Sequence, residues 1–168
     1  VNTVYDSDGI TGLGDEAVTL SDTSIAASTL STVDGNTTGT VDAGTVTTLT
    51  GSAEDVNSLY DSDEIDGLGD EAVTISDTTI SASVLNTLDG NTSGVIDASS
   101  LTTITGTGED ALTAFESAGI SGLTFDASNY LASYTDLLAA FGDDLGIARV
   151  HYLSLIHISE PTRREGLS

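Results

Sequence analysis

The sequence predicts an α/β fold in which short parallel strands and short helices wind into a right-handed solenoid, with a helical segment at the C-terminal end. Residues 1–55 recur as residues 56–110 without a gap, and about two thirds of the aligned positions are identical. Tandem units of this length stack so that each buries its apolar face against its neighbours. Within each unit, strand-like alternation and helix-like spacing follow one another. Parallel strands joined by crossovers turn right-handed.

The chain divides into three parts. We expect tandem repeats over residues 1–123, made of residues 1–55, residues 56–110 and a partial unit at residues 111–123. After residue 123 the repeat pattern breaks. We expect a truncated helical module over residues 124–152 and a non-native tail over residues 153–168.

The first half of each unit predicts a strand followed by a helix. Polar and apolar residues alternate over residues 17–21 and 72–76, as in a strand with one buried face. A helix is expected after Ser81 as its N-cap, with Ile80 and Leu85 as a hydrophobic staple. Its apolar side chains share one face, and Gly90 is expected to end it.

The second half predicts another strand and another helix. A short extended piece is expected at residues 95–98, whereas residues 101–106 allow no firm assignment. Residues 52–55 and 107–110 resemble capping boxes with Asp at the third helical position, and acidic residues suit a helix N-terminus. The expected order in each unit is therefore strand, helix, strand, helix.

The charge of the chain excludes several classes of partner. There are 27 acidic and three basic residues, for a net charge of −24, and no Lys or Arg precedes Arg149. Such a chain repels nucleic acid, because it cannot neutralise phosphates, and it attracts divalent cations collectively. Cysteine is absent, so no disulfide or thiol chemistry is expected. No stretch approaches the roughly 20 apolar residues of a membrane span, so membrane insertion is not expected.

Acidic turns make calcium the one candidate ligand. Asp6 and Asp8, and again Asp61 and Asp63, place carboxylates two residues apart, as calcium loops do. The EF-hand pattern fails, because Ile10 or Ile65 stands at its fifth position, and the calcium-binding nonapeptide is absent. We interpret these turns first as solvated loops that attract cations collectively, with a specific calcium site as the alternative.

Three other motifs have ordinary structural interpretations. The G-x-G-x-x-A pattern at residues 12–17 and 67–72 matches a dinucleotide fingerprint, but no strand is expected before it and two acids occupy the phosphate position. We interpret it as a turn. His151 has no partners for catalysis, and the Asn-x-Ser/Thr triplets at residues 36–38 and 91–93 are interpreted as turn residues.

Two segments resemble known repeat modules. Residues 125–152, with the pattern F-D-x-x-x-Y-L-A-S-Y-x-D-L-x-x-A-F-G…H-Y, resemble a short helical repeat of large secreted bacterial proteins, often found beside calcium-binding nonapeptide repeats. The 55-residue Thr- and Asp-rich units resemble tandem repeats of giant exported proteins of marine bacteria and cyanobacteria. Residues 153–163 (LSLIHISEPTR) resemble the translation of a sequencing-library adapter, so we expect a fragment of a longer chain.

These resemblances imply an extracellular or cell-surface setting and no catalytic activity. The leading hypothesis is a spacer or adhesin-stalk segment of a large bacterial repeat protein, with divalent cations as candidate partners and an unspecified partner at a cell surface or matrix. Two alternatives stay open. One is a non-catalytic flanking region of an exported toxin or enzyme of the calcium-repeat type. The other is a calcium-responsive folding module.

Overall fold

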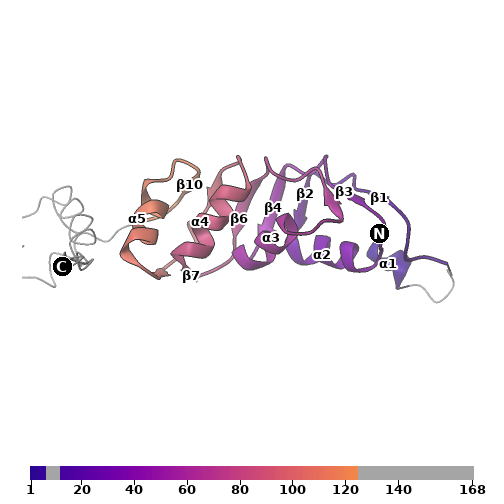
Figure 1. Ribbon diagram of the computed structural model, residues 1–168, viewed down its shortest axis with the longest axis horizontal. Coiled ribbons are helices and arrows are strands. Elements are labelled where there is room, and N and C mark those ends of the chain that lie inside the picture. The colour runs from indigo at the N-terminus through magenta and orange to yellow at the C-terminus, as the bar shows by residue number, and fades with distance from the viewer. Residues whose placement is uncertain (7–11, 125–168) are drawn as a thin grey trace, which may run out of the picture.

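The structure is a computed structural model that describes residues 1–6 and 12–124. These residues form an elongated row in which helices lie side by side along one edge and short strands stack along the other (Figure 1). The helical module and tail predicted after residue 123, together with His151, lie outside the described residues, apart from Thr124.

Five helices and ten short strands make up the described part of the chain. In order they are α1 (Asn2–Tyr5), β1 (Val18–Thr19), β2 (Ser24–Ala26), α2 (Ala27–Gly35), β3 (Val41–Asp42), β4 (Thr48–Gly51), α3 (Ala53–Tyr60), β5 (Ile65–Asp66), β6 (Ala72–Ile75), β7 (Thr79–Ser81), α4 (Ala82–Asn91), β8 (Ile96–Asp97), β9 (Thr103–Thr105), α5 (Gly108–Glu116) and β10 (Ile120–Ser121).

All strand pairs in this part of the chain are parallel, which confirms the predicted α/β class with parallel sheets. One sheet has the order β1-β3-β5, a second has the order β10-β8-β6-β4-β2, and a third pairs β7 with β9. Each strand pairs with one about 24 residues away in sequence, as in Thr48 with Ala72. A connection of this length leaves room for the short helix between most successive pairs.

The pairing register repeats with the sequence. It is convenient to call residues 12–66 the first unit, which contains β1–β5, and residues 67–121 the second unit, which contains β6–β10. Val18 pairs with Val41 in the first unit, and Val73 pairs with Ile96 in the second, each residue 55 positions later. Ser24 with Thr48 and Thr79 with Thr103 follow the same rule.

Helix starts follow the predicted caps in the second half of each unit. The side chains of Ser52 and Thr107 accept hydrogen bonds from the backbone N–H groups of Asp55 and Asp110, both at 3.1 Å. Ser81 is the N-cap residue of α4, as predicted, but its hydroxyl bonds that of Ser83 at 2.8 Å and makes no cap bond. The start of α4 therefore depends on packing more than on capping.

The strands are more numerous than the sequence analysis anticipated. Two residues or more of strand directly precede α2 and α4, at β2 and β7, and residues 103–105 form β9 in the segment that allowed no firm assignment. These pieces have only three or four residues, so their alternation is too brief to be recognised in the sequence. Pairing with a neighbouring coil, and not local preference, makes them strands.

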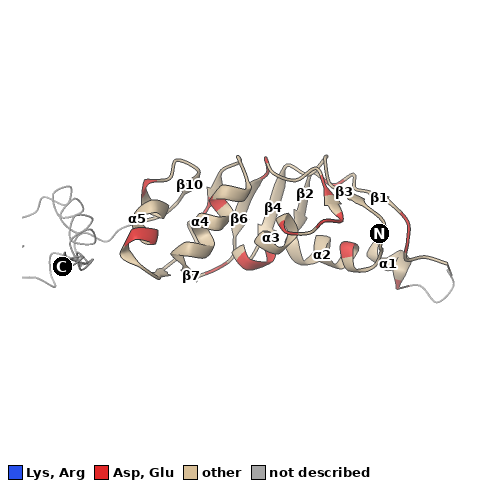
Figure 2. Ribbon diagram, in the orientation of Figure 1, with Lys and Arg blue, Asp and Glu red and all other residues tan. Residues whose placement is uncertain are grey.

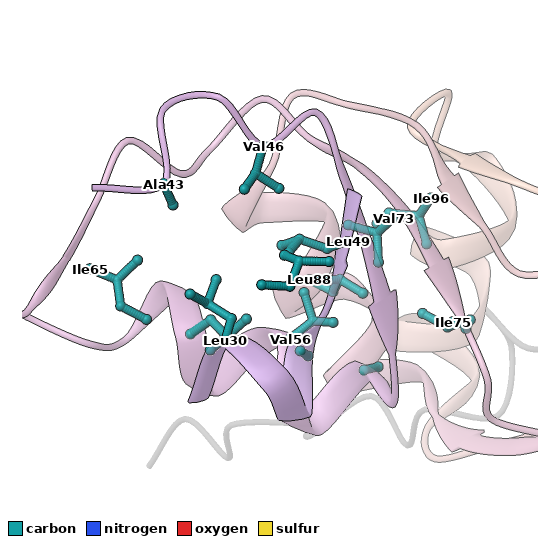
Figure 3. Packing of buried hydrophobic residues seen from close by; sticks show 14 of the residues in the cluster. Leu30, Ala43, Val46, Leu49, Val56, Ile65, Val73, Ile75, Leu88 and Ile96 are labelled. Carbon is teal, nitrogen blue, oxygen red and sulfur yellow. The ribbon is translucent and has the colours of Figure 1, made fainter. Parts of the chain in front are cut away.

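The core lies between the strands and the helices and runs continuously along the row. Apolar side chains from both layers point into it, and Leu30, Leu49, Val56, Leu85 and Leu88 are all fully buried (Figure 3). Each such side chain contributes about 1.5–3 kcal/mol when removed from water. Because Leu49 and Val56 belong to the first unit and Leu85 and Leu88 to the second, the two units share one core.

Candidate functional site

The contact between the two units is the most elaborate site in the described residues. We call it the central seam, formed by residues 48–61 of the first unit and residues 71–94 of the second. Strand β4 pairs with β6 over four residues, from Thr48 with Ala72 to Gly51 with Ile75. The ladder is closed at its end by the Ser76 N–H, which donates to the Gly51 carbonyl at 2.8 Å.

A carboxylate from the second unit caps a helix of the first. The Asp77 Oδ2 atom accepts the N–H of Ala53, the first residue of α3, at 2.8 Å. The first N–H groups of a helix lack partners within it and carry a partial positive charge, so an anion there is stabilising. The equivalent residue of the first unit, Asp22, is exposed and caps no helix among the described residues.

A buried glutamate ties α3 to the turn before β6. The Glu71 side chain is fully buried, and its Oε2 atom accepts the Tyr60 hydroxyl at 2.9 Å and the Gly69 N–H at 2.9 Å. Burial raises the pKa of Tyr60 well above its ordinary value of about 10, and the hydrogen bond to Glu71 raises it further. The neutral tyrosine is therefore the form that holds the seam.

The first unit carries the same arrangement in a looser form. Glu16 accepts the Gly14 N–H at 2.8 Å and the Tyr5 hydroxyl at 3.4 Å, and it is only half-buried. The backbone bond from Gly14 lowers the pKa of Glu16. Equivalent residues thus repeat their contacts, and the contacts tighten where a neighbouring unit covers them.

The turn after α4 lies directly on the peptide of Glu71. The buried Thr92 hydroxyl donates to the Glu71 carbonyl at 2.7 Å and accepts the Gly94 N–H at 3.0 Å. A Cβ atom at Gly94 would overlap the Glu71 carbonyl and would lie 2.7 Å from the Ala72 nitrogen. Glycine is therefore required here by close backbone approach.

Amides connect the helices across the seam. Asn57 on α3 donates from Nδ2 to the Val84 carbonyl of α4 at 3.2 Å, and its Oδ1 accepts Asn91 Nδ2 at 3.0 Å. The next pair of helices is joined in the same way, by Asn86 Nδ2 and the Asp110 carbonyl at 2.9 Å. Side chains that satisfy buried backbone groups fix one relative position of neighbouring helices.

The predicted calcium residues lie at the edges of this arrangement. Asp6 and Asp61 follow α1 and α3 as C-cap residues, and both are exposed, as is Asp63. Asp8 lies outside the described residues. Within residues 1–6 and 12–124, no group of three or more His, Asp or Glu side chains converges closely enough to hold a metal ion. The calcium site stays a prediction.

Negative charge covers the described surface. Acidic residues occur on helices, turns and strand ends along the whole row, and no Lys or Arg is present to offset them (Figure 2). Hydrogen bonds absorb some of this charge locally. The Ser99 hydroxyl and N–H lower the pKa of Asp97, whose Oδ1 accepts that N–H at 3.0 Å.

Comparison of the chain with protein-family models, with characterised proteins and with solved structures gives no match. In the described residues, no helix is both long and apolar enough to cross a membrane.

Sequence analysis did not identify the residues that matter most at the seam. Glu71 was interpreted as part of an acidic turn, and Thr92 as a turn residue of an Asn-x-Ser/Thr triplet. The recurrence of a Tyr, a Glu and a Thr at identical positions of both units was the available signal.

Proposed function

We propose that residues 1–123 form a segment of a right-handed α/β solenoid that serves as an acidic spacer or adhesin stalk in a large secreted or cell-surface protein, without catalysis. The observation that carries this proposal is the double pairing of β6. On one side β6 pairs with β4 of the first unit, and on the other it pairs with β8 of its own unit. The ladder therefore passes from unit to unit without interruption.

Such a ladder suits a mechanical role. Neighbouring units share strand hydrogen bonds, a common core and helix caps, so the row resists bending at the seam. Each unit contacts only its neighbours, and the length of the row then grows in proportion to the number of units. A uniformly acidic surface keeps parallel stalks apart and soluble.

Small-angle X-ray scattering on length variants tests this proposal. Extra copies of residues 56–110 are inserted after residue 110, so that the chain carries two, four or six units. We expect the maximum dimension to rise by a constant increment for each unit while the cross-section stays the same. A maximum dimension that levels off, or a growing cross-section, would contradict a spacer, because the units would then be packing into a globule.

A calcium-responsive folding module is the second candidate, favoured by the exposure of Asp61 and Asp63 beside the seam. Calcium binding to the folded chain would raise its melting temperature. Melting followed by circular dichroism is measured with millimolar calcium, with magnesium and with a chelator. A rise with calcium alone supports the module, and equal melting in all three conditions removes it.

A further inference from the structure

The first strand of the row has an open edge whose counterpart in the second unit is covered. Strand β6 lies between β4 and β8, whereas its equivalent β1 pairs only with β3 among the described strands. The N–H groups of Ala72 and Ser76 donate to Thr47 and Gly51 across the seam. The equivalent groups of Ala17 and Ser21 have no backbone acceptor within residues 1–6 and 12–124.

A groove lies beside this open edge. It has a volume of about 440 Å³ and is lined by Leu20, Asp22, Ser24, Ile25, Thr29 and Val33, with residues 1–3 along one side. Its counterparts in the second unit are the residues that face β4 and α3. Ile75 pairs with Gly51, Asp77 caps α3, and the Val84 carbonyl accepts Asn57. By this equivalence the groove is shaped for a β4–α3 segment.

The opposite end of the described row carries such a segment. Residues 103–115 are equivalent to residues 48–60, and they comprise β9 and α5. Leu101, Ile104 and Ala111 are half-buried there, whereas their counterparts Val46, Leu49 and Val56 are at most 2 % exposed. The apolar side chains that meet a neighbour at the central seam therefore lack full cover at this end.

We propose that the groove binds the β9–α5 end of a second copy of this chain, so that molecules associate head to tail in the register of the central seam. Thr102 to Thr105 of one molecule would pair with Ala17 to Leu20 of the next. Asp22 would cap the partner's α5 by accepting the N–H of its Gly108, as Asp77 accepts that of Ala53. This inference stands on the repeated register and not on the proposed spacer role.

Helix α1 competes with this docking. Its four residues occupy the place that residues 57–60 of α3 take at the central seam, and none of its side chains is buried. Its hydrogen bonds are long, at 3.4 Å from Tyr5 to Glu16 and 3.5 Å from Asn36 to Asn2. The incoming α5 displaces α1, and a chain without residues 1–6 should therefore associate more strongly.

The association is weaker than the central seam and increases with salt. Ala111 and Ala114 stand where α3 has Val56 and Leu59, so less apolar surface is covered. Two molecules with a charge of −24 also repel each other. Raising the salt from about 0.1 M to about 1 M shortens the screening length from roughly 10 Å to roughly 3 Å and relieves that repulsion.

Sedimentation velocity of the full chain, over a range of concentrations and at both salt levels, measures the association. Asp22→Lys removes the acceptor and places a cation at the helix N-terminus, and it should abolish association. Asp63→Lys makes the same charge change on an exposed turn away from the groove and should leave association intact or stronger. Circular dichroism of each variant checks that it is folded.

Two variants block the other end. Ile104→Lys places a charge where the apolar edge is covered and should abolish association. Gly108→Pro removes the N–H that Asp22 would accept, at the first position of α5, where proline fits a helix. It should weaken association roughly tenfold, the effect of losing one charge-assisted hydrogen bond, and it serves in place of Ile104→Lys if that variant does not fold.

Mixing the two kinds of variant is the decisive step. Asp22→Lys retains a competent α5 end, and Ile104→Lys retains a competent groove, so neither associates alone but together they form a 1:1 dimer. The proposal is overturned if the wild-type chain stays monomeric at every concentration and salt level, or if Asp22→Lys and Asp63→Lys associate equally. A mixture that stays monomeric, or a chain without residues 1–6 that associates less, overturns it as well.

Discussion

Gly94→Ala tests the closest backbone approach at the central seam. A methyl group at residue 94 would overlap the Glu71 carbonyl and lie 2.7 Å from the Ala72 nitrogen, and both neighbours are backbone groups that cannot rotate away. The turn must therefore move off β6 by several tenths of an ångström. Forced overpacking of this kind costs about 1–3 kcal/mol. The displaced Thr92–Glu71 hydrogen bond adds about 1 kcal/mol, for a total loss of about 2–4 kcal/mol.

Gly90→Ala is the matched control four residues earlier. Gly90 lies within α4, and a Cβ atom there meets nothing within 4 Å. Replacing a helical glycine by alanine stabilises by about 0.5–1 kcal/mol. The same chemical change should therefore have opposite signs at the two positions.

Urea unfolding followed by circular dichroism measures both variants, with the slope checked for a change in the surface exposed on unfolding. We expect a lower midpoint for Gly94→Ala and a slightly higher midpoint for Gly90→Ala. If Gly94→Ala unfolds within about 0.5 kcal/mol of the wild type, the ordinary range for a surface substitution, the close approach at the seam is refuted.

Three further predictions concern the same contacts. Glu71→Met leaves the Tyr60 hydroxyl and the Gly69 N–H without their acceptor and should cost about 2–4 kcal/mol in urea unfolding, whereas Glu16→Met, at a half-buried position, should cost less than half as much. Because the folded state raises the pKa of Tyr60, its stabilisation is complete below pH 10 and is lost as the pH rises; stability measured between pH 9 and 11 should fall less steeply in Tyr60→Phe. Ser52→Ala should cost about 1 kcal/mol by removing the cap of α3, and Ser58→Ala, on an exposed turn of the same helix, should be near neutral; equal effects would show that the cap contributes nothing.

The repeat made the class of fold predictable. A 55-residue period with alternating and helical segments gave the expected parallel strands and short helices, and the caps at Ser52 and Thr107 lie where their sequence patterns placed them. Those signals are local or periodic, and a single sequence is sufficient to reveal them.

Contacts between units were not predictable in the same way. Strands β7 and β9 have three residues each and exist because a neighbouring coil supplies hydrogen-bond partners. Asp77 caps a helix that begins 24 residues before it, so no capping pattern reveals it. Glu71 appears in the sequence as one more acid in an acidic turn, and its burial follows only from the close approach of Thr92 and Tyr60.

Disulfide trapping across the seam is the most direct test of the register on which this account depends. Thr50 and Thr74 are paired neighbours on β4 and β6, and the wild-type chain has no cysteine. Adjacent strands lie about 4.8 Å apart, within reach of a disulfide. The slipped pair Thr50 and Ser76 is diagonal, at roughly 8 Å, beyond that reach. We predict that the double variant Thr50→Cys/Thr74→Cys closes an intramolecular bond on mild oxidation and that Thr50→Cys/Ser76→Cys does not. Closure of the slipped pair alone would contradict the register, and the shared seam with it.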